Sequence, residues 1–326
     1  MKLLALSADD LRAALPMPAA IGAMKDAYAA IATKESVAPQ RIAVPVAPHE
    51  GTTLLMGGYV PSMGLAAKIV SVFPRNAERG TAPIQGLVVV LDPETGAPAA
   101  LIDGTALTAW RTGAGSGAAT DVLARKDARV GAVIGCGAQG RTQLLAMCAV
   151  RELDEVRVHA RSPERVFAFC DTMRESVHAT LVPAKTATEA IEGADVVCTA
   201  TPARAPLFDG ACLADGAHVN AVGSFTLEMM ELDAHTISRA TVFVDEVDAA
   251  LEEAGELAAT EREGATHRDD WTELGLVTAG LVPGRTSQEE LTLFKSVGHA
   301  AQDVAAATRA VAEARRLGLG FELELV

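Results

Sequence analysis

The sequence predicts an α/β protein with two domains: one built on a doubly wound parallel sheet, and a second, α+β domain with a mainly antiparallel sheet. Short β-like segments with short connections occupy residues 42–103, which indicates antiparallel pairing. Strand-like and helix-like segments then alternate from residue 130 to about residue 248, a pattern typical of a parallel sheet. At 326 residues the chain is long enough for both domains.

Two helices are expected ahead of the first strand. Ser7 can cap a short helix that has Asp9 and Asp10 in its first turn. A second helix is predicted over residues 17–34, where apolar side chains recur at helical spacing: Ile21, Met24, Tyr28 and Ile31. The β-like segments follow at 42–46, 52–60, 65–73, 84–92 and 97–103, the last two joined by a turn containing Pro93 and Gly96.

A helix rich in alanine and glycine is predicted next, over residues 105–125. Its glycines, Gly113, Gly115 and Gly117, indicate close packing against another backbone. The strands expected after it are 130–134, 156–160, 194–200, 218–223, 241–245 and 292–298, and the last of them leads into a final helix over 300–316. The acidic stretch 246–263 is expected to form one solvated helix without a function.

Glycines lie at the junction between the strand 130–134 and the helix after it. Gly135, Gly137 and Gly140 have GxGxxG spacing within the segment GCGAQG, which also holds Ala138 and Gln139. In a Rossmann fold the first glycine permits the turn, the second lets the backbone approach a pyrophosphate, and the third lets the helix pack closely on the strand. Because the helix N-terminus adds unpaired N–H groups, the segment predicts a dinucleotide site.

The end of the next strand determines which nicotinamide dinucleotide is expected. An acidic residue about 20 positions beyond the glycines binds the ribose 2′-hydroxyl of NAD, whereas a cation there accepts the 2′-phosphate of NADP. Here the strand ends in VHARSPER, without an acidic residue at its end, and Arg161, Ser162 and Arg165 suit a phosphate. We therefore expect NADPH, with NADH possible; the alternative is that two surface arginines open a helix.

Lys68 interrupts an apolar pattern. In LAAKIVSVF it alternates with Ala66, Val70 and Val72, so it shares a strand face with apolar side chains. An apolar site lowers the pKa of a lysine, which suits acid–base chemistry or contact with a substrate. The alternative is a lysine at a sheet edge whose ammonium group reaches water.

Two arginines are candidates for binding an anion. Arg41 lies at a strand start, and Arg111 interrupts an apolar helix with small neighbours. An arginine binds a carboxylate through two N–H bonds, which explains how an acidic protein can still hold an anionic substrate. On its own, each is more often a surface arginine, and Arg111 is the better candidate because its neighbours are small and apolar.

Composition excludes several classes of function. The net charge is −14, aromatic residues make up 4% and the chain has no basic cluster, which argues against nucleic acid and anionic membranes. The N-terminal apolar run is too short for a signal peptide, and no stretch is long enough to span a bilayer. Five cysteines without a CxxC pair indicate free thiols in a cytoplasmic protein, and the seven histidines lack metal-site spacing, so no metal is expected.

Together, these residues resemble the ornithine cyclodeaminase/mu-crystallin family. The resemblance extends over nearly the whole chain and is specific to the family, although not to one activity within it. It depends on PQRIAVP (39–45), AAKIVSVFP (66–74), IDGTALTAWRTGAGS (102–116), VIGCGAQG (133–140), VNAVG (219–223), MELD (230–233) and TLFKSVGHAAQD (292–303).

The resemblance implies a substrate-binding and dimerisation domain, residues 1–115 and 302–326, around an inserted Rossmann NAD(P)-binding domain, residues 116–301. It also implies that Arg41 and Arg111 hold the substrate carboxylate, that Lys68 lies at the reacting carbon, and that the protein is a homodimer. The cofactor contacts that it implies are Thr112, Cys198, Thr199, Ala200, Ser296 and Gly298.

One departure from the family's cyclodeaminases bears on the reaction. They carry an acid–base Asp two residues after the glycine of the VG step, where this chain has Phe225. Phenylalanine can neither take a proton nor bind an ammonium group by charge. The mu-crystallin branch, which reduces ketimines with NADPH, also lacks the Asp, and its second strand has a similar ending.

The expected function is therefore the NADPH-dependent reduction of a cyclic imino acid. Δ1-Pyrroline-2-carboxylate would give L-proline, and Δ1-piperideine-2-carboxylate would give L-pipecolate. The alternatives are an NAD-dependent ornithine cyclodeaminase, an open-chain amino-acid dehydrogenase, and a protein that binds NADPH without turnover.

Overall fold

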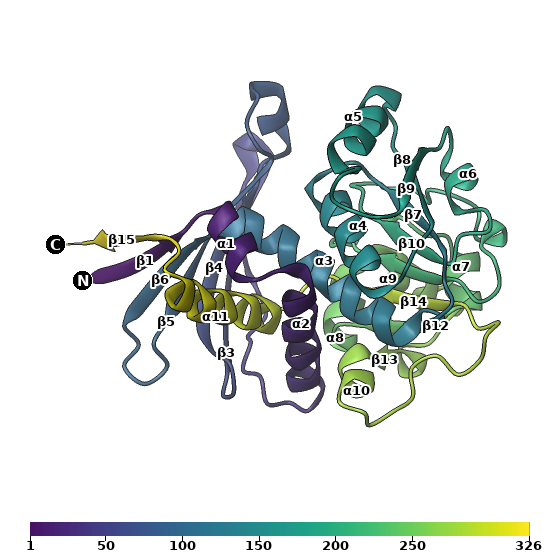
Figure 1. Ribbon diagram of the computed structural model, residues 1–326. Helices are drawn as coiled ribbons and strands as arrows, with labels where there is room; N and C mark the ends of the chain where they lie inside the picture. Colours follow the sequence, from purple (N-terminus) through teal and green to yellow (C-terminus); the bar gives the residue numbers. More distant parts are fainter. Residues whose placement is uncertain (326) are drawn as a thin grey trace. The chain divides into compact units, whose positions relative to one another are not determined.

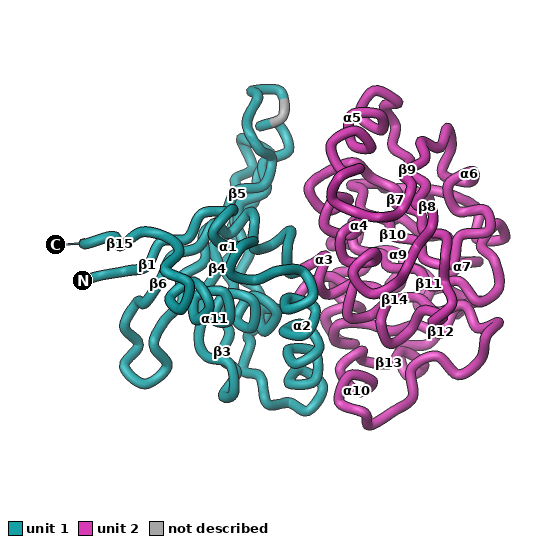
Figure 2. Tube along the Cα trace, viewed as in Figure 1, with its two compact units in different colours: residues 1–111, 299–326 teal, residues 112–298 magenta. Residues whose placement is uncertain are grey.

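The computed structural model describes residues 1–325, without the side chain of residue 77. The chain divides into two compact units (Figure 2): unit 1 is Met1–Arg111 with His299–Val326, and unit 2 is Thr112–Gly298. Unit 2 is therefore inserted into the sequence of unit 1. Val326, which the sequence-based domain assignment includes, lies outside the described residues. The assignment of substrate binding to one unit and cofactor binding to the other remains a prediction.

Within the described residues, unit 1 contains a sheet of seven strands in the order β15-β1-β6-β5-β4-β3-β2. β1 pairs with β6 in parallel and every other neighbouring pair is antiparallel, which confirms the mainly antiparallel sheet. The strands are β1 (Lys2–Leu6), β2 (Ile42–Val46), β3 (Gly51–Val60), β4 (Gly64–Val72), β5 (Ile84–Leu91), β6 (Pro98–Asp103) and β15 (Phe321–Glu324). β1 and β15 were not expected from the sequence, because each is short and gains its partners from distant parts of the chain.

Helices cover one face of this sheet: α1 (Ala8–Ala14), α2 (Met17–Ala32) and α11 (Ala300–Leu317). Figure 1 shows α11 beside α2, and α11 also packs on β3 and β4. The predicted cap is confirmed, because the Ser7 hydroxyl accepts the Asp10 N–H at 3.2 Å. The predicted apolar face of α2 is buried as well. Two short 3₁₀ helices, η1 (Ala47–His49) and η2 (Pro74–Arg79), connect strands.

Strand register gives the sheet two different faces. One cross-strand row runs through Met56, Lys68, Val88 and Ile102, and its members are buried. The adjacent row runs through Ile42, Leu55, Ile69 and Leu87, whose side chains point the other way and are exposed. An apolar row on the face that α11 does not cover is unusual for a surface exposed to water.

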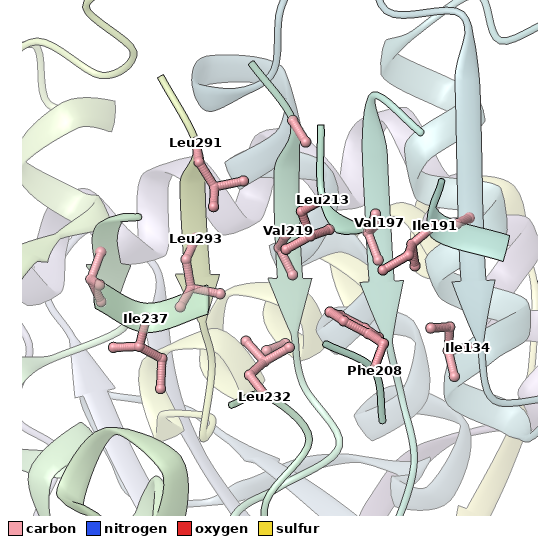
Figure 3. Close-up of a cluster of buried hydrophobic side chains, with 14 of the residues drawn as sticks. Ile134, Ile191, Val197, Phe208, Leu213, Val219, Leu232, Ile237, Leu291 and Leu293 are labelled. Carbon is pink, nitrogen blue, oxygen red and sulfur yellow. The ribbon is translucent and has the colours of Figure 1, made fainter. Parts of the chain in front are cut away.

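The described part of unit 2 is built on an eight-stranded parallel sheet in the order β13-β12-β14-β11-β10-β7-β8-β9, which confirms the doubly wound prediction. The strands are β7 (Val130–Ile134), β8 (Glu155–His159), β9 (Thr180–Pro183), β10 (Val196–Thr199), β11 (His218–Ala221), β12 (Thr241–Val244), β13 (Thr272–Glu273) and β14 (Thr292–Lys295). Side chains of the central strands, including Val197, Val219 and Leu293, form a core with residues of the flanking segments (Figure 3).

The helices of unit 2 follow its strands in alternation. They are α4 (Ala138–Val150), α5 (Pro163–Met173), α6 (Ala187–Ile191), α7 (Ala234–Arg239), α8 (Val247–Glu253), α9 (Gly255–Arg262) and α10 (Leu274–Thr278), with 3₁₀ turns η3 (Gly210–Cys212) and η4 (Arg268–Asp270). α3 (Gly104–Leu123) begins in unit 1 and continues in unit 2. The expected close packing of α3 is confirmed at Gly113, where a Cβ would lie 2.6 Å from the Thr142 carbonyl oxygen.

The prediction of one solvated helix over residues 246–263 is wrong. The segment forms two helices, α8 and α9, and Glu256 and Leu257 at the start of α9 are buried. The cause is the close approach of Gly255 to another loop, since a Cβ there would collide with the Met229 carbonyl oxygen. This approach draws the first turn of α9 into the interior of unit 2.

Candidate active site

Lys68 lies in the middle of β4, on the buried face of the unit 1 sheet. It is 2% exposed, and its Nζ lies 2.6 Å from Oδ2 of Asp303 in the first turn of α11. The predicted apolar surroundings are confirmed, because Ala66 and Val70 are buried on the same face. The alternative of a lysine that reaches water at a sheet edge is excluded.

Arg111, on α3, contacts the same carboxylate. Its Nε donates to Asp303 Oδ1 at 3.1 Å, and its Nη1 donates to Gln302 Oε1 at 3.0 Å. Gln302 in turn donates to the Tyr28 hydroxyl at 2.6 Å and accepts the His299 N–H at 2.8 Å. Asp303 and Gln302, in the first turn of α11, therefore hold Arg111 in one orientation. Gln302 is itself fixed by its hydrogen bonds to Tyr28 and His299.

The charges of this cluster act on one another. Burial lowers the pKa of Lys68 to about 8; Asp303 opposes this effect, whereas Arg111 and Arg41 add to it. Burial disfavours the charged form of Asp303, but Lys68 and Arg111 outweigh burial and hold its pKa below the usual value. Around neutral pH this cluster therefore has three cations, Lys68, Arg41 and Arg111, and one carboxylate, Asp303. This excess of positive charge suits an anionic ligand.

The sequence predicts Arg41 as a site residue but does not predict Asp303. Arg41 immediately precedes β2 and is half-buried, as expected for a strand start. Asp303 was not predicted as a site residue, because an acidic residue in the first turn of a helix is ordinarily explained by the helix dipole. The one available signal was indirect: a lysine on an apolar face requires a counter-charge.

The glycine loop lies between β7 and α4. Gly135 has φ +119°, and a Cβ at Gly140 would collide with the Gly135 carbonyl oxygen. Gly137 is the N-cap of α4 without a side-chain cap, and a Cβ at Gly137 would meet open space. The loop is therefore shaped as a dinucleotide pyrophosphate requires: tight where helix meets strand and open where the helix N-terminus begins. Ala138 is exposed and Gln139 is half-buried beside it.

The side chains of Arg165 and Arg141 bring positive charge to this loop. Burial raises the pKa of the Cys136 thiol to about 11, while Arg165 and Arg141 act on it in the opposite direction. Their positive charges therefore act at the glycine loop. Arg161 and Arg165 are both exposed, which is compatible with a phosphate ligand and also with the alternative of surface arginines.

Ser162 caps a helix in the structure, and its contact with a phosphate remains a prediction. Ser162 caps α5 by accepting the Arg165 N–H at 3.3 Å, and its hydroxyl donates to Glu164 Oε2 at 2.7 Å. The hydroxyl hydrogen expected for a phosphate is therefore directed to a carboxylate. Glu164, within ARSPER, was overlooked in the sequence, and its negative charge lies close to where a 2′-phosphate was predicted.

Of the other predicted cofactor residues, Cys198, Thr199 and Ala200 lie at the end of β10, and Thr112 lies on α3. Cys198 and Thr199 are buried, so their side chains lie inside the unit, whereas Ala200 is half-buried. Thr112, the first residue of unit 2, is 8% exposed. The structure does not bring all of these side chains to one surface, and their contact with a cofactor remains a prediction.

Ser296 and Gly298 are held by a carboxylate that the sequence did not reveal. Asp245, at the end of β12, accepts the Ser296 hydroxyl at 2.9 Å, the Val297 N–H at 2.8 Å and the Gly298 N–H at 2.7 Å, all through Oδ2. The chain leaves unit 2 at Gly298, five residues before Asp303, and enters it directly after Arg111. Arg111 and Asp303 of unit 1 are therefore close in sequence to predicted cofactor residues of unit 2: Arg111 to Thr112, and Asp303 to Gly298.

A second buried carboxylate organises the carboxyl ends of β10 and β11. Glu231 accepts the Thr199 hydroxyl at 2.9 Å, the Thr201 N–H and the Gly223 N–H, each at 2.7 Å. Its pKa is raised by burial, against the effect of Lys295. Ligands of doubly wound sheets bind beside this edge, so Glu231 holds in place the loops that border the predicted cofactor site.

The described residues contain no cluster of three or more His, Cys, Asp or Glu side chains that could hold a metal ion. Over the same residues, no helix has the length and apolar character needed to cross a membrane. The cysteines are unpaired in the described structure.

Comparison with known proteins identifies close relatives over the full chain. A Δ1-pyrroline-2-carboxylate reductase of Bacillus cereus is 38% identical over 330 residues, covering 99% of this chain and 100% of that protein. The structure of the Thermococcus litoralis Δ1-pyrroline-2-carboxylate reductase, in complex with NADH and L-proline, has a TM-score of 0.94 at 35% identity and covers 98% of this chain and 99% of its own.

A second solved structure, an archaeal alanine dehydrogenase dimer with bound NAD, has a TM-score of 0.92 at 30% identity and covers both chains completely. The model of the ornithine cyclodeaminase/mu-crystallin family matches residues 2–316. These relatives are oxidoreductases that act on C=N or CH–NH bonds, and the sequence-based recognition is confirmed. The chain belongs to the ornithine cyclodeaminase/mu-crystallin family.

Proposed function

We propose that this protein reduces a cyclic imino acid, Δ1-pyrroline-2-carboxylate or its six-membered homologue, to L-proline or L-pipecolate with NADPH. The observation that carries the proposal is the buried cluster of Lys68, Arg111 and Asp303, which has a positive excess in a protein of net charge −14. Relatives named Δ1-pyrroline-2-carboxylate reductase, one of them bound to NADH and L-proline, support the substrate class.

Arg41 and Arg111 bind the substrate carboxylate in this proposal. Arg111 is held by Gln302 and Asp303, so little conformational freedom is lost when a ligand binds to it. A guanidinium group also matches the planar geometry of a carboxylate, which a lysine does not. Binding the carboxylate orients the ring and its imine carbon.

Lys68 supplies the proton and the charge that the reaction requires. With a pKa of about 8, its ammonium group is mostly protonated at neutral pH and can still release its proton. Reduction of the imine adds a hydride at carbon and leaves an amine; Lys68, or a water that it positions, keeps the imine nitrogen protonated. The reduced nicotinamide supplies the hydride when it is bound.

The glycine loop, Gly135 to Gly140, binds the dinucleotide pyrophosphate, and Arg161 with Arg165 binds the 2′-phosphate of NADPH. Support comes from the charge of both arginines and from the field of Arg165 at Cys136. Glu164 opposes this preference, and the Thermococcus litoralis relative was solved with NADH. The choice between the two cofactors is therefore the part of the proposal that most needs measurement.

Phe225 favours imine reduction over cyclodeamination. It follows Ser224 in the loop after β11, and its side chain offers no proton and no charge for an amino group. An open-chain amino-acid dehydrogenase is the second candidate, since an archaeal alanine dehydrogenase has nearly the same fold.

One assay distinguishes these functions. Purified protein is offered Δ1-pyrroline-2-carboxylate or Δ1-piperideine-2-carboxylate with NADPH or NADH, pyruvate with ammonia and either cofactor, and L-ornithine with NAD. Absorbance at the nicotinamide band and ammonia are followed. We expect turnover of the cyclic imines; ammonia release from ornithine without imine reduction would refute the proposal, and turnover of pyruvate alone would establish the second candidate.

We also propose that two copies of the chain associate through the exposed row Ile42, Leu55, Ile69 and Leu87, in the cytoplasm. The row crosses four neighbouring strands in register and is apolar throughout. The alanine dehydrogenase relative is described as a dimer. A flat apolar row that matches its own copy about a twofold axis is a common form of homodimer interface.

A further inference from the structure

Asp303 contacts two of the groups to which the proposed reaction assigns roles, Lys68 and Arg111. Each of its oxygens contacts a different cation: Oδ2 lies 2.6 Å from Lys68 Nζ, and Oδ1 lies 3.1 Å from Arg111 Nε. All three side chains are at least nine-tenths buried. A buried carboxylate shared in this way determines both the positions and the charge states of its partners.

We propose that Asp303 is a positioning residue that sets the spacing between Lys68 and Arg111 and keeps Lys68 protonated until the reaction requires its proton. The inference rests on the proposed imino-acid reduction. It adds that the residue controlling proton supply lies on α11, in the second segment of unit 1, rather than on the strand that carries the lysine.

The geometry supports positioning rather than direct contact with the substrate. Asp303 carries the charge that a carboxylate substrate also carries, so the two would repel one another. Its oxygens are directed to Lys68 and Arg111, and the adjacent Gln302 bonds to Arg111 and to Tyr28. Asp303 therefore acts through the cations that it holds.

The surroundings of Lys68 show why a carboxylate is needed. Its cross-strand neighbours Met56 and Val88 are buried and apolar, so the lysine is far from water. Arg111 on α3 and Arg41 ahead of β2 add positive charge near the ammonium group. Burial and both arginines disfavour protonation of Lys68, and Asp303 is the group that opposes them.

Removing the negative charge of Asp303 should change the pH at which Lys68 loses its proton. In Asp303→Asn the amide keeps the shape but loses the charge, so the pKa of Lys68 should fall by about 1–3 units. The pH above which imine reduction declines should fall by the same amount. Asp303→Glu restores the charge and should recover most of both values, whereas a purely structural role would not move a pH profile in this way.

The titration can be measured without turnover. The chain has seven lysines, so protein labelled with carbon-13 at lysine Cε gives few NMR signals, and the signal that disappears in Lys68→Arg belongs to Lys68. The titration is recorded on the complete, substrate-free protein. Glu313→Gln is the matched control, because it removes a carboxylate from the exposed side of the same helix, where Glu313 pairs with Arg316 at 2.8 Å.

The expected result is a lower Lys68 midpoint in Asp303→Asn, an unchanged midpoint in Glu313→Gln, and a parallel shift in the pH profile of kcat/KM. An unchanged midpoint in folded Asp303→Asn overturns the proposal, and so does a shifted midpoint with an unchanged profile. If Asp303→Asn does not fold, Asp303→Ser decides, since it also removes the charge and an unchanged Lys68 midpoint again overturns the proposal. If the wild type reduces no cyclic imine, the proposed function fails. The Lys68 titration midpoint in Asp303→Asn still tests whether Asp303 keeps Lys68 protonated.

Discussion

Lys295 Nζ lies 3.3 Å from Glu256 Oε1, and both side chains are at most 1% exposed, at the end of β14 and the start of α9. The ammonium group also donates to the Ser224 carbonyl oxygen and hydroxyl, each at 2.6 Å. This buried pair fixes the loop that carries Phe225 after β11. Together with the close approach of Gly255 to the Met229 carbonyl oxygen, it explains why an acidic stretch that resembles a solvated helix in the sequence enters the interior of unit 2.

Replacing Lys295 by alanine should therefore destabilise the protein strongly. The change leaves the Glu256 carboxylate buried without its cation, at a cost of about 3–5 kcal/mol in the free energy of unfolding. Urea unfolding followed by circular dichroism measures this cost. Lys2→Ala is the control, because it removes an exposed ion pair with Glu322 and should have little effect. Equal losses in the two variants would show that the buried pair does not stabilise the fold.

Lys68→Ala should lose turnover while it retains NADPH binding. Loss of a positioned proton donor costs about 10²–10⁴ in kcat, whereas the glycine loop lies in the other unit of the chain. Steady-state kinetics with Δ1-pyrroline-2-carboxylate and the quenching of protein fluorescence by NADPH measure the two properties separately. Turnover within threefold of wild type would contradict the role given to Lys68.

The pH dependence of the reaction follows from the pKa of Lys68. Burial lowers that pKa to about 8, so the protonated form is present below pH 8 and disappears above it. Because imine reduction uses the protonated form, kcat/KM should fall about tenfold per pH unit above that value. Oxidation of L-proline uses the neutral form and should rise through the same range. Profiles with the same slope in both directions would show that another group controls proton transfer.

Cofactor choice should respond to the charges after β8. Arg161→Glu removes a cation and adds a carboxylate where the 2′-phosphate is expected, so the ratio of kcat/KM for NADPH to that for NADH should fall tenfold or more, since a charged hydrogen bond contributes about 1.5–3 kcal/mol. Glu164→Gln removes the carboxylate beside Ser162 and should raise the same ratio. An unchanged ratio in both variants would place the 2′-phosphate elsewhere or exclude it.

Ile69→Glu should disrupt the proposed dimer. Ile69 lies in the centre of the exposed apolar row, paired with Leu55 on one side and Leu87 on the other. In a twofold interface the substitution would bring two carboxylates into an apolar contact. Light scattering coupled to size-exclusion chromatography measures the mass. Leu281→Glu, at an exposed apolar residue of unit 2, is the control and should leave the mass unchanged.

The sequence by itself determined the class of each sheet and most of the strands and helices that build it. Periodicity identified the face of α2 and the strands β2 to β6, and the spacing of Gly135, Gly137 and Gly140 indicated the glycine loop. These are local properties, because hydrophobic spacing and the special conformations of glycine act over a few residues. Lys68 was visible for the same reason, as a charge on an apolar strand face.

Only the tertiary structure decided which charges meet. Lys68 and Asp303 are separated by 235 residues, Arg111 and Asp303 by 192, and Lys295 and Glu256 by 39, with β13 and α10 between them. An acidic residue has the same local pattern whether it faces water or a buried lysine, so Asp303, Glu256 and Glu231 could not be distinguished from surface carboxylates. Burial creates the difference, because a charge away from water requires a partner, and the fold alone supplies it.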